Sequence, residues 1–203
     1  MTSDNHKKAL LLSYFTVGYN VLEGIASLIA GFLAGSIALV GFGLDSFVES
    51  LSGIVMIWRF RNHEKISHEE EERVEKKAIQ LISTTFFILA AYVFYESFTK
   101  LYYRELPDPS LFGIIIAIVS LLVMPVLFYL KYKTGKTMGS RSLVADSKQT
   151  LTCVFLSFSL LIGLGLNYIY GLWWTDPIVG LVIVVFLIHE GYETYKEQKL
   201  CSC

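Results

Sequence analysis

Six apolar runs, each about long enough to cross a bilayer as a helix, divide almost the whole chain between them. In lipid, the polar groups of the backbone are satisfied only within helices or closed barrels. Of the 203 residues, 54% are hydrophobic and 17% are charged, a balance typical of an integral membrane protein. We therefore expect an all-α integral membrane protein with one membrane domain over residues 1–203 and no soluble C-terminal domain. The expected helices cover residues 9–34, 36–58, 78–99, 110–130, 143–168 and 174–193.

The positions of lysine and arginine predict how these helices are oriented, because such residues collect in cytoplasmic loops. If the six helices are right, 14 of the 17 basic residues lie on one side of the membrane, and Lys100 and Arg104 lie on the other. We expect a multi-pass protein of the cell membrane with both termini in the cytoplasm. The net charge of −1 gives no reason to expect nucleic acid as a partner. The 14 residues are Lys7, Lys8, Arg59, Arg61, Lys65, Arg73, Lys76, Lys77, Lys131, Lys133, Lys136, Arg141, Lys196 and Lys199.

Two carboxylates stand four residues apart inside the second apolar run, at Asp45 and Glu49. On a helix this spacing places both on one face. An ionisable group at mid-membrane depth costs several kcal/mol unless it faces protein, water or a cation, and it marks a functional site by default. The first run carries Asn20 and Glu23 about midway, and Glu23 is a candidate for the same cavity as Asp45.

A weak repeat relates the second expected helix to the fifth. Residues 36–49 align without a gap to residues 140–153, and in that register Asp45 falls on Gln149 and Glu49 on Cys153. The two helices run in opposite directions by the charge count, and an inverted repeat indicates a transporter with a site near the membrane midplane. Both polar pairs lie roughly 14 to 15 Å deep at 1.5 Å per residue, so we expect them to meet. Similar pairs are Ser36 with Ser140, Leu39 with Leu143, Val40 with Val144, Gly41 with Ala145, and Ser46 with Thr150.

The residues of the two polar pairs suit a divalent transition metal. Thiolate favours softer ions such as Zn²⁺, and carboxylates also accept Mn²⁺, Fe²⁺ or Co²⁺. An acid one turn before Gln149 is placed to pass the ion in from the cytoplasm. We expect no resident cofactor, because the metal is cargo. The predicted metal-binding residues are Asp45, Glu49, Gln149, Cys153 and Asp146.

Three other features are weaker candidates for binding or structure. The His- and Glu-rich segment 63–72 offers metal ligands, but its charge pattern favours a solvated extension of the third helix. Asp176 precedes a proline at the start of the sixth helix, which favours a helix cap over a ligand. The tail cysteines Cys201 and Cys203 offer two thiols for a soft ion, and a disulfide is not expected in a reducing compartment.

The chain resembles the cation diffusion facilitator family over essentially its whole length, and is closest to the short members that lack a cytoplasmic C-terminal domain. This resemblance implies a six-helix bundle, an acidic pair on helix 2, a His or Asp pair on helix 5, and alternating access. It also implies export of Zn²⁺ or a similar ion, with Cd²⁺ among the alternatives, in exchange for protons, in a homodimer formed here through the membrane domain. The motifs are Leu44-Asp45-Ser46-Phe47-Val48-Glu49, Ala145-Asp146 with Gln149 and Cys153, and Thr175-Asp176-Pro177-Ile178-Val179-Gly180.

The helix 5 pair departs from the family pattern. Gln149 stands where a His is usual and Cys153 where an Asp is usual. Gln149 does not titrate, so proton coupling would use Asp45, Glu49 or Cys153. The thiol would also move the metal preference.

Two alternatives remain beside the transporter. A membrane sensor or scaffold would bind metal without moving it. An intramembrane aspartyl protease is suggested by Gly41-Phe42-Gly43-Leu44-Asp45, which is near a Gly-x-Gly-Asp signature. One extra residue breaks that motif, and proteolysis gives no reason for Glu49 or Cys153. We therefore expect a transporter and not an enzyme.

Overall fold

Six helices account for nearly all of the chain that the computed structural model describes, which is residues 2–62, 68–105 and 107–200, and no strand occurs in these ranges. The expected all-α architecture is therefore confirmed. The His63 and Glu64 candidates and the tail cysteines lie outside the described residues. The helices are α1 (Thr2–Ala34), α2 (Ile37–Asn62), α3 (His68–Tyr103), α4 (Leu111–Met138), α5 (Arg141–Tyr170) and α6 (Thr175–Leu200).

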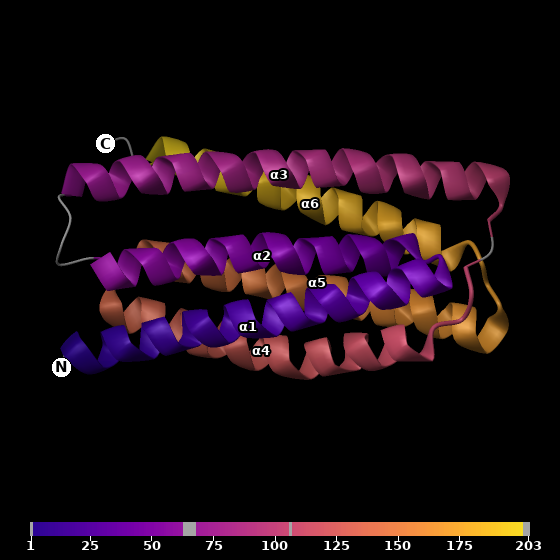
Figure 1. Ribbon diagram of the computed structural model, residues 1–203, viewed down its shortest axis with the longest axis horizontal. Coiled ribbons are helices and arrows are strands. Elements are labelled where there is room, and N and C mark those ends of the chain that lie inside the picture. The colour runs from indigo at the N-terminus through magenta and orange to yellow at the C-terminus, as the bar shows by residue number, and fades with distance from the viewer. Residues whose placement is uncertain (1, 63–67, 106, 201–203) are drawn as a thin grey trace.

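The helices run roughly antiparallel, and the start of α1 and the end of α6 lie at the same end of the bundle (Figure 1). We call this the terminal end. Helix α1 packs along α2, α4 along α5, and α3 along α6, while α2 also contacts α3, α5 and α6. Helix α2 therefore lies at the centre of the bundle, in contact with α1, α3, α5 and α6.

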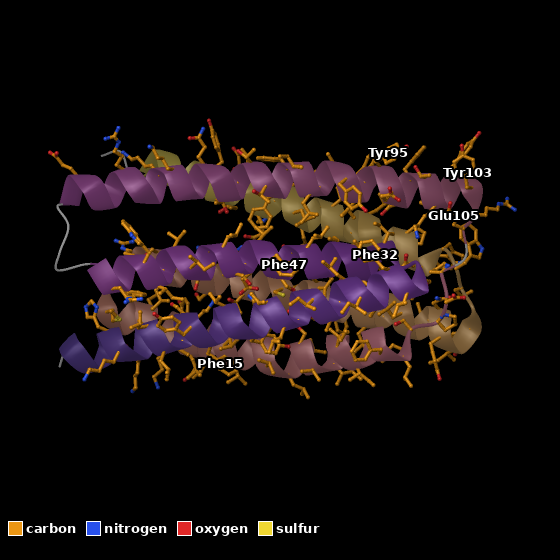
Figure 2. The ribbon with its side chains drawn as sticks, viewed as in Figure 1. Phe15, Phe32, Phe47, Tyr95, Tyr103 and Glu105 are labelled. Atoms are coloured by element: carbon orange, nitrogen blue, oxygen red, sulfur yellow. The ribbon has the colours of Figure 1, made fainter. Side chains whose placement is uncertain are left out.

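The bundle buries polar residues and exposes apolar ones, as a protein surrounded by lipid does. One face of α1 carries five polar side chains that are at most 5% exposed, whereas Leu22, Phe32 and Leu33 on the same helix are more than 70% exposed. Aromatic side chains such as Tyr95 and Tyr103 project from the outer surface (Figure 2). The buried polar residues are Ser13, Thr16, Asn20, Glu23 and Ser27.

Five described helices, α1, α2, α4, α5 and α6, are long and apolar enough to cross a membrane. Helix α3 completes the six-helix bundle beside α6. It begins at His68, so the Glu-rich run is helical, as the charge pattern favoured. Helix α4 differs from the expectation, because it continues for eight residues beyond position 130.

The turns from α1 to α2 and from α4 to α5 share one geometry, which extends the inverted repeat beyond the aligned segments. In each turn the second glycine has a positive φ, 62° or 66°. The serine N–H donates to the carbonyl oxygen of the first glycine at 2.9 or 3.0 Å. The serine hydroxyl accepts from the leucine N–H at 3.1 or 3.4 Å. Equivalent residues are Gly31 and Gly135, Gly35 and Gly139, Ser36 and Ser140, Leu39 and Leu143, and Val40 and Val144.

The close approach within the first turn predicts that Gly31→Ala destabilises the bundle. A Cβ at position 31 would lie 2.7 Å from Val40 Cγ2 and 2.9 Å from the Val40 backbone nitrogen. The backbone atom moves only if the turn opens, so we expect a loss of about 1–3 kcal/mol in the free energy of unfolding. Gly18→Ala is the matched control on the same helix, because no atom lies within 4 Å of its new Cβ. Thermal unfolding in detergent measures both, and equal stability of the two variants would contradict the close contact.

Candidate functional site

The two carboxylates of α2 are both buried, Asp45 at 7% and Glu49 at 1% exposure. Asp45 accepts no hydrogen bond from any described residue, and its electrostatic neighbours are three other carboxylates, those of Glu49, Glu190 and Glu23. Carboxylates gathered away from water repel one another unless protons or a cation neutralise them. The surroundings of Asp45 therefore favour the binding of a cation.

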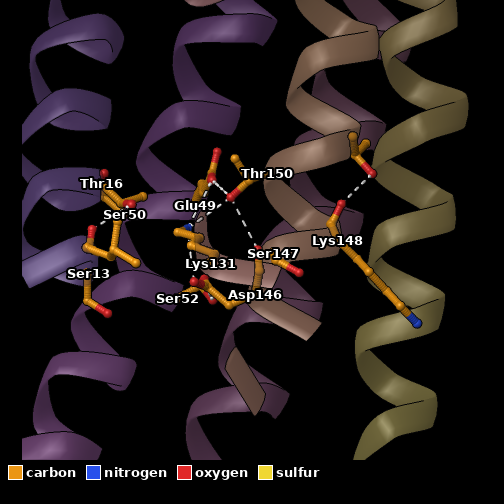
Figure 3. A network of polar contacts seen from close by, with 12 residues as sticks. Ser13, Thr16, Glu49, Ser50, Ser52, Lys131, Asp146, Ser147, Lys148 and Thr150 are labelled. Carbon is orange, nitrogen blue, oxygen red and sulfur yellow. Dashed lines mark hydrogen bonds and ion pairs between the residues drawn. The ribbon is translucent and has the colours of Figure 1, made fainter. Parts of the chain in front are cut away.

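Glu49 belongs to a buried polar network that joins α2, α4 and α5 (Figure 3). Its Oε1 atom accepts a hydrogen bond from the Thr150 hydroxyl at 2.6 Å and lies 3.7 Å from Lys131 Nζ. The Lys131 ammonium is 2.9 Å from Asp146 Oδ2 and donates to Thr150 Oγ1 at 2.9 Å. Ser52 donates to the other oxygen of Asp146 at 3.1 Å. One buried ammonium is thus shared between two carboxylates.

Helix α1 supplies a second group of polar side chains. Glu23 accepts hydrogen bonds from the Tyr19 hydroxyl at 2.9 Å and from the Ser46 hydroxyl at 3.0 Å. The Asn20 amide lies close enough to Glu49 to interact with it, but both of its polar atoms are buried without a hydrogen-bond partner among the described residues. Glu23 is therefore a hydrogen-bonded buried acid that also neighbours Asp45.

Helix α5 brings Cys153 and Thr150 close to Glu49. Cys153 is buried and interacts electrostatically with Glu49, Glu23 and Asp45. Thr150, one position after Gln149, donates a hydrogen bond to Glu49 Oε1 at 2.6 Å. The Gln149 Nε2 atom is buried with no hydrogen-bond partner in the described chain.

Asp146 is held in the ion pair with Lys131, so it is not a free acid at the entrance. Four of the five predicted residues, Asp45, Glu49, Asp146 and Cys153, thus lie near one another, but they do not form a ready-made coordination sphere. Within the described ranges, no three His, Cys, Asp or Glu side chains converge to hold a metal ion. Two of the acids in this region are already engaged: Glu23 by Tyr19 and Ser46, and Glu49 by Thr150 and Lys131.

Unsatisfied atoms nevertheless suit a metal cation. Glu49 Oε2 is buried without a hydrogen-bond partner among the described residues, as are both polar atoms of the Asn20 side chain. Buried polar atoms without partners are costly, and an incoming cation would satisfy the carboxylate and carbonyl oxygens. These oxygens are therefore candidates for contact with a cation.

Lys131, Thr150 and Glu190 lie close to the predicted residues but were not among them. Lys131 was expected in a cytoplasmic basic loop, but α4 runs to Met138 and the lysine is 0% exposed. Glu190 on α6 is half-buried and neighbours Asp45 electrostatically. A signal for Lys131 is the repeat itself, since it places position 131 opposite the buried Ser27.

Asp176 is a cap, as expected, but it caps α2. Its Oδ2 atom accepts from the Ile37 N–H at 2.9 Å, and its other oxygen accepts from the Ser36 hydroxyl. An acid at a helix N-terminus satisfies free N–H groups and complements the helix dipole. Asp176 therefore ties the start of α6 to the start of the helix that carries Asp45.

Together, the bundle and its buried acidic residues define a multi-pass α-helical membrane protein with a polar interior suited to a cation. Residues 13–200 match the cation efflux transmembrane domain family, and the chain belongs to that family. The members of this family are transporters and not enzymes, so the family resemblance predicted from the motifs is confirmed and the protease alternative is not supported.

Individual relatives are distant in sequence. The chain is 24% identical to transmembrane protein 163 of Xenopus laevis, over 91% of this chain and 65% of that protein. It is 23% identical to a cadmium, cobalt and zinc/H⁺-K⁺ antiporter of Bacillus velezensis, over 95% of this chain and 62% of the relative. It is 26% identical to an uncharacterized transporter of Methanocaldococcus jannaschii, over 92% of this chain and 66% of the relative. The chain thus spans less than two thirds of the length of the first two of these relatives.

Proposed function

We propose that this protein is a secondary transporter that exports a divalent transition-metal cation from the cytoplasm in exchange for protons. Zn²⁺ is the preferred cargo, with Cd²⁺, Co²⁺, Fe²⁺ and Mn²⁺ as alternatives. The observation that carries the proposal is the environment of Asp45, a buried carboxylate with no hydrogen bond from the described chain and three carboxylates as electrostatic neighbours. Similarity to a protein named as a cadmium, cobalt and zinc antiporter supports the class of cargo.

The proposed site lies between α2 and α5. Asp45 and Glu49 supply carboxylate oxygens, Cys153 supplies a thiolate, and Gln149 supplies an amide oxygen. Carboxylates and thiolates bind metal only when deprotonated, so metal binding releases protons and the return of protons favours metal release. Gln149 carries no proton in this exchange, so Asp45, Glu49 and Cys153 would carry the protons that are exchanged for metal.

The inverted repeat supports alternating access. Helices α2 and α5 follow matched tight turns and contact each other in the interior. Repeats of this kind allow one half of a bundle to rock against the other around a fixed site. We place the terminal end of the bundle in the cytoplasm, on the strength of its basic residues. We also propose a homodimer formed through the membrane domain, because the apolar outer surface offers contacts between helices as well as with lipid.

Direct binding tests the choice of cargo. We expect the purified protein in detergent to bind Zn²⁺ and Cd²⁺ more tightly than Co²⁺, Fe²⁺ or Mn²⁺, because a thiolate favours the softer ions. Isothermal titration calorimetry with each ion, at matched pH and salt, gives the order of affinities. A folded protein that binds none of the five ions would contradict the proposal.

The thiol predicts a change in metal preference for Cys153→Asp. A carboxylate in place of the thiol removes the soft ligand, so the ratio of Cd²⁺ to Mn²⁺ affinity should fall by about tenfold or more. Cys201 and Cys203 are replaced by serine in both proteins, so that the two proteins differ only at position 153 and no other cysteine can bind the metal. Competition titration measures the ratio, and an unchanged ratio would exclude Cys153 as a ligand.

A further inference from the structure

Lys131 is the feature of the interior that the proposed transport cycle has not used. Its side chain is 0% exposed in the middle of the polar network (Figure 3). Lysine is almost never fully buried unless it is paired with a negative charge. Here the ammonium lies 2.9 Å from Asp146 Oδ2 and 3.7 Å from Glu49 Oε1. It therefore balances part of the charge on a carboxylate of the metal site.

The two distances are unequal, and each has a structural cause. Asp146 is anchored by Ser52, which donates to its other oxygen at 3.1 Å. Thr150 stands between the ammonium and Glu49, accepting from Lys131 at 2.9 Å and donating to Glu49 at 2.6 Å. The ammonium is thus held firmly by Asp146 and more loosely by Glu49. A lysine has a flexible four-carbon stem, so small movements between the two acids are available to it.

A metal ion on Glu49 and the ammonium near the same oxygen would repel each other strongly in a medium of low dielectric constant. In the described chain no three acidic, thiol or imidazole ligands converge on one point, and Glu49 is already engaged by Thr150 and Lys131. Metal binding therefore requires the ammonium to move away from Glu49, and the firm contact with Asp146 provides the place to which it moves.

We propose that Lys131 is a tethered counter-cation that competes with the transported metal for Glu49. It withdraws to Asp146 when metal binds and approaches Glu49 again when metal leaves, so that the empty site is never without a positive charge. This inference rests on the proposed function, because it assumes a metal site at Asp45 and Glu49. This competition lowers the affinity of the site for metal and so favours release of the metal.

A cycle of variants tests the competition by zinc binding to the purified protein, independently of transport. In Asp146→Asn the lysine keeps Glu49 and loses the other of its two charged partners among the described residues, so we expect weaker zinc binding. In Lys131→Met/Asp146→Asn the competitor and its anchor are both removed, so we expect zinc to bind at least about tenfold more tightly than to the wild type, as the loss of one ion-pair contact implies. Lys133→Met is the matched control, because Lys133 is exposed two residues along the same helix and should leave the affinity unchanged.

The outcomes separate this inference from the proposed function. Wild-type protein that binds no zinc would overturn both. Zinc binding that Asp45→Asn abolishes, but that the double variant does not tighten, would overturn the inference alone. Weaker binding in both Asp146→Asn and the double variant would instead make Asp146 a metal ligand and overturn the competition. If the double variant does not fold, unchanged affinity in Asp146→Asn still overturns the proposal.

Discussion

Replacing Asp45 with asparagine is expected to reduce zinc transport by at least about 100-fold, which corresponds to about 2.7 kcal/mol. The amide has the shape of the carboxylate but no charge, so it removes the anion whose described neighbours are other acids. One of the two carboxylate ligands proposed on α2 is lost, while helix packing is preserved. The measurement is the initial rate of zinc uptake into proteoliposomes that contain equal amounts of folded protein.

Asp108→Asn is the control for this substitution, because Asp108 is exposed near the turn between α3 and α4. We expect its transport rate to match that of the wild type. An Asp45→Asn variant that keeps more than half of the wild-type rate would show that the ion passes without this carboxylate. The α2 pair would then be a structural feature of the interior and not a transport site.

Lys131→Met is expected to cause the largest loss of stability. Methionine has a similar length but no charge, so Glu49 and Asp146 are left buried without their shared ammonium. Breaking a buried ion pair by removing one partner costs about 3–5 kcal/mol. Denaturation in detergent, followed by loss of helical signal, measures the difference from the wild type.

The double variant Lys131→Met/Asp146→Asn should recover most of that loss, because it removes a carboxylate together with the ammonium. Replacing both partners of a buried pair is often close to neutral. Lys133→Met again serves as the exposed control, with an expected change within about 0.5 kcal/mol. A single Lys131→Met variant as stable as the wild type would mean that the lysine does not compensate the acids.

The bundle was predictable because a bilayer fixes the length of each apolar run and leaves helices as the structure that satisfies their backbones. The same reasoning placed Asp45 and Glu49 in the interior, since acids within an apolar run cannot face lipid at low cost. The equivalence of Ser36 with Ser140 could also be predicted from the sequence repeat, and the structure shows the two serines in turns of the same geometry. These predictions rest on local constraints that each segment carries by itself.

The position of Lys131 was not predicted, because a lysine just after an apolar run also fits a cytoplasmic loop. The choice depends on Glu49 and Asp146, which come from other helices and need a counter-charge. The partner of Glu49 was missed for a related reason. The aligned register pairs Glu49 with Cys153, and Thr150, three residues before Cys153 and on the same face of α5, donates the hydrogen bond.

The most direct test of the transport proposal records zinc and pH together in sealed proteoliposomes made with wild-type protein. A zinc gradient is applied, and indicators inside the vesicles report both ions. We expect zinc to enter while protons leave, and we expect both signals to disappear with Asp45→Asn. Zinc that stays outside vesicles containing folded wild-type protein would contradict transport and favour a membrane sensor or scaffold.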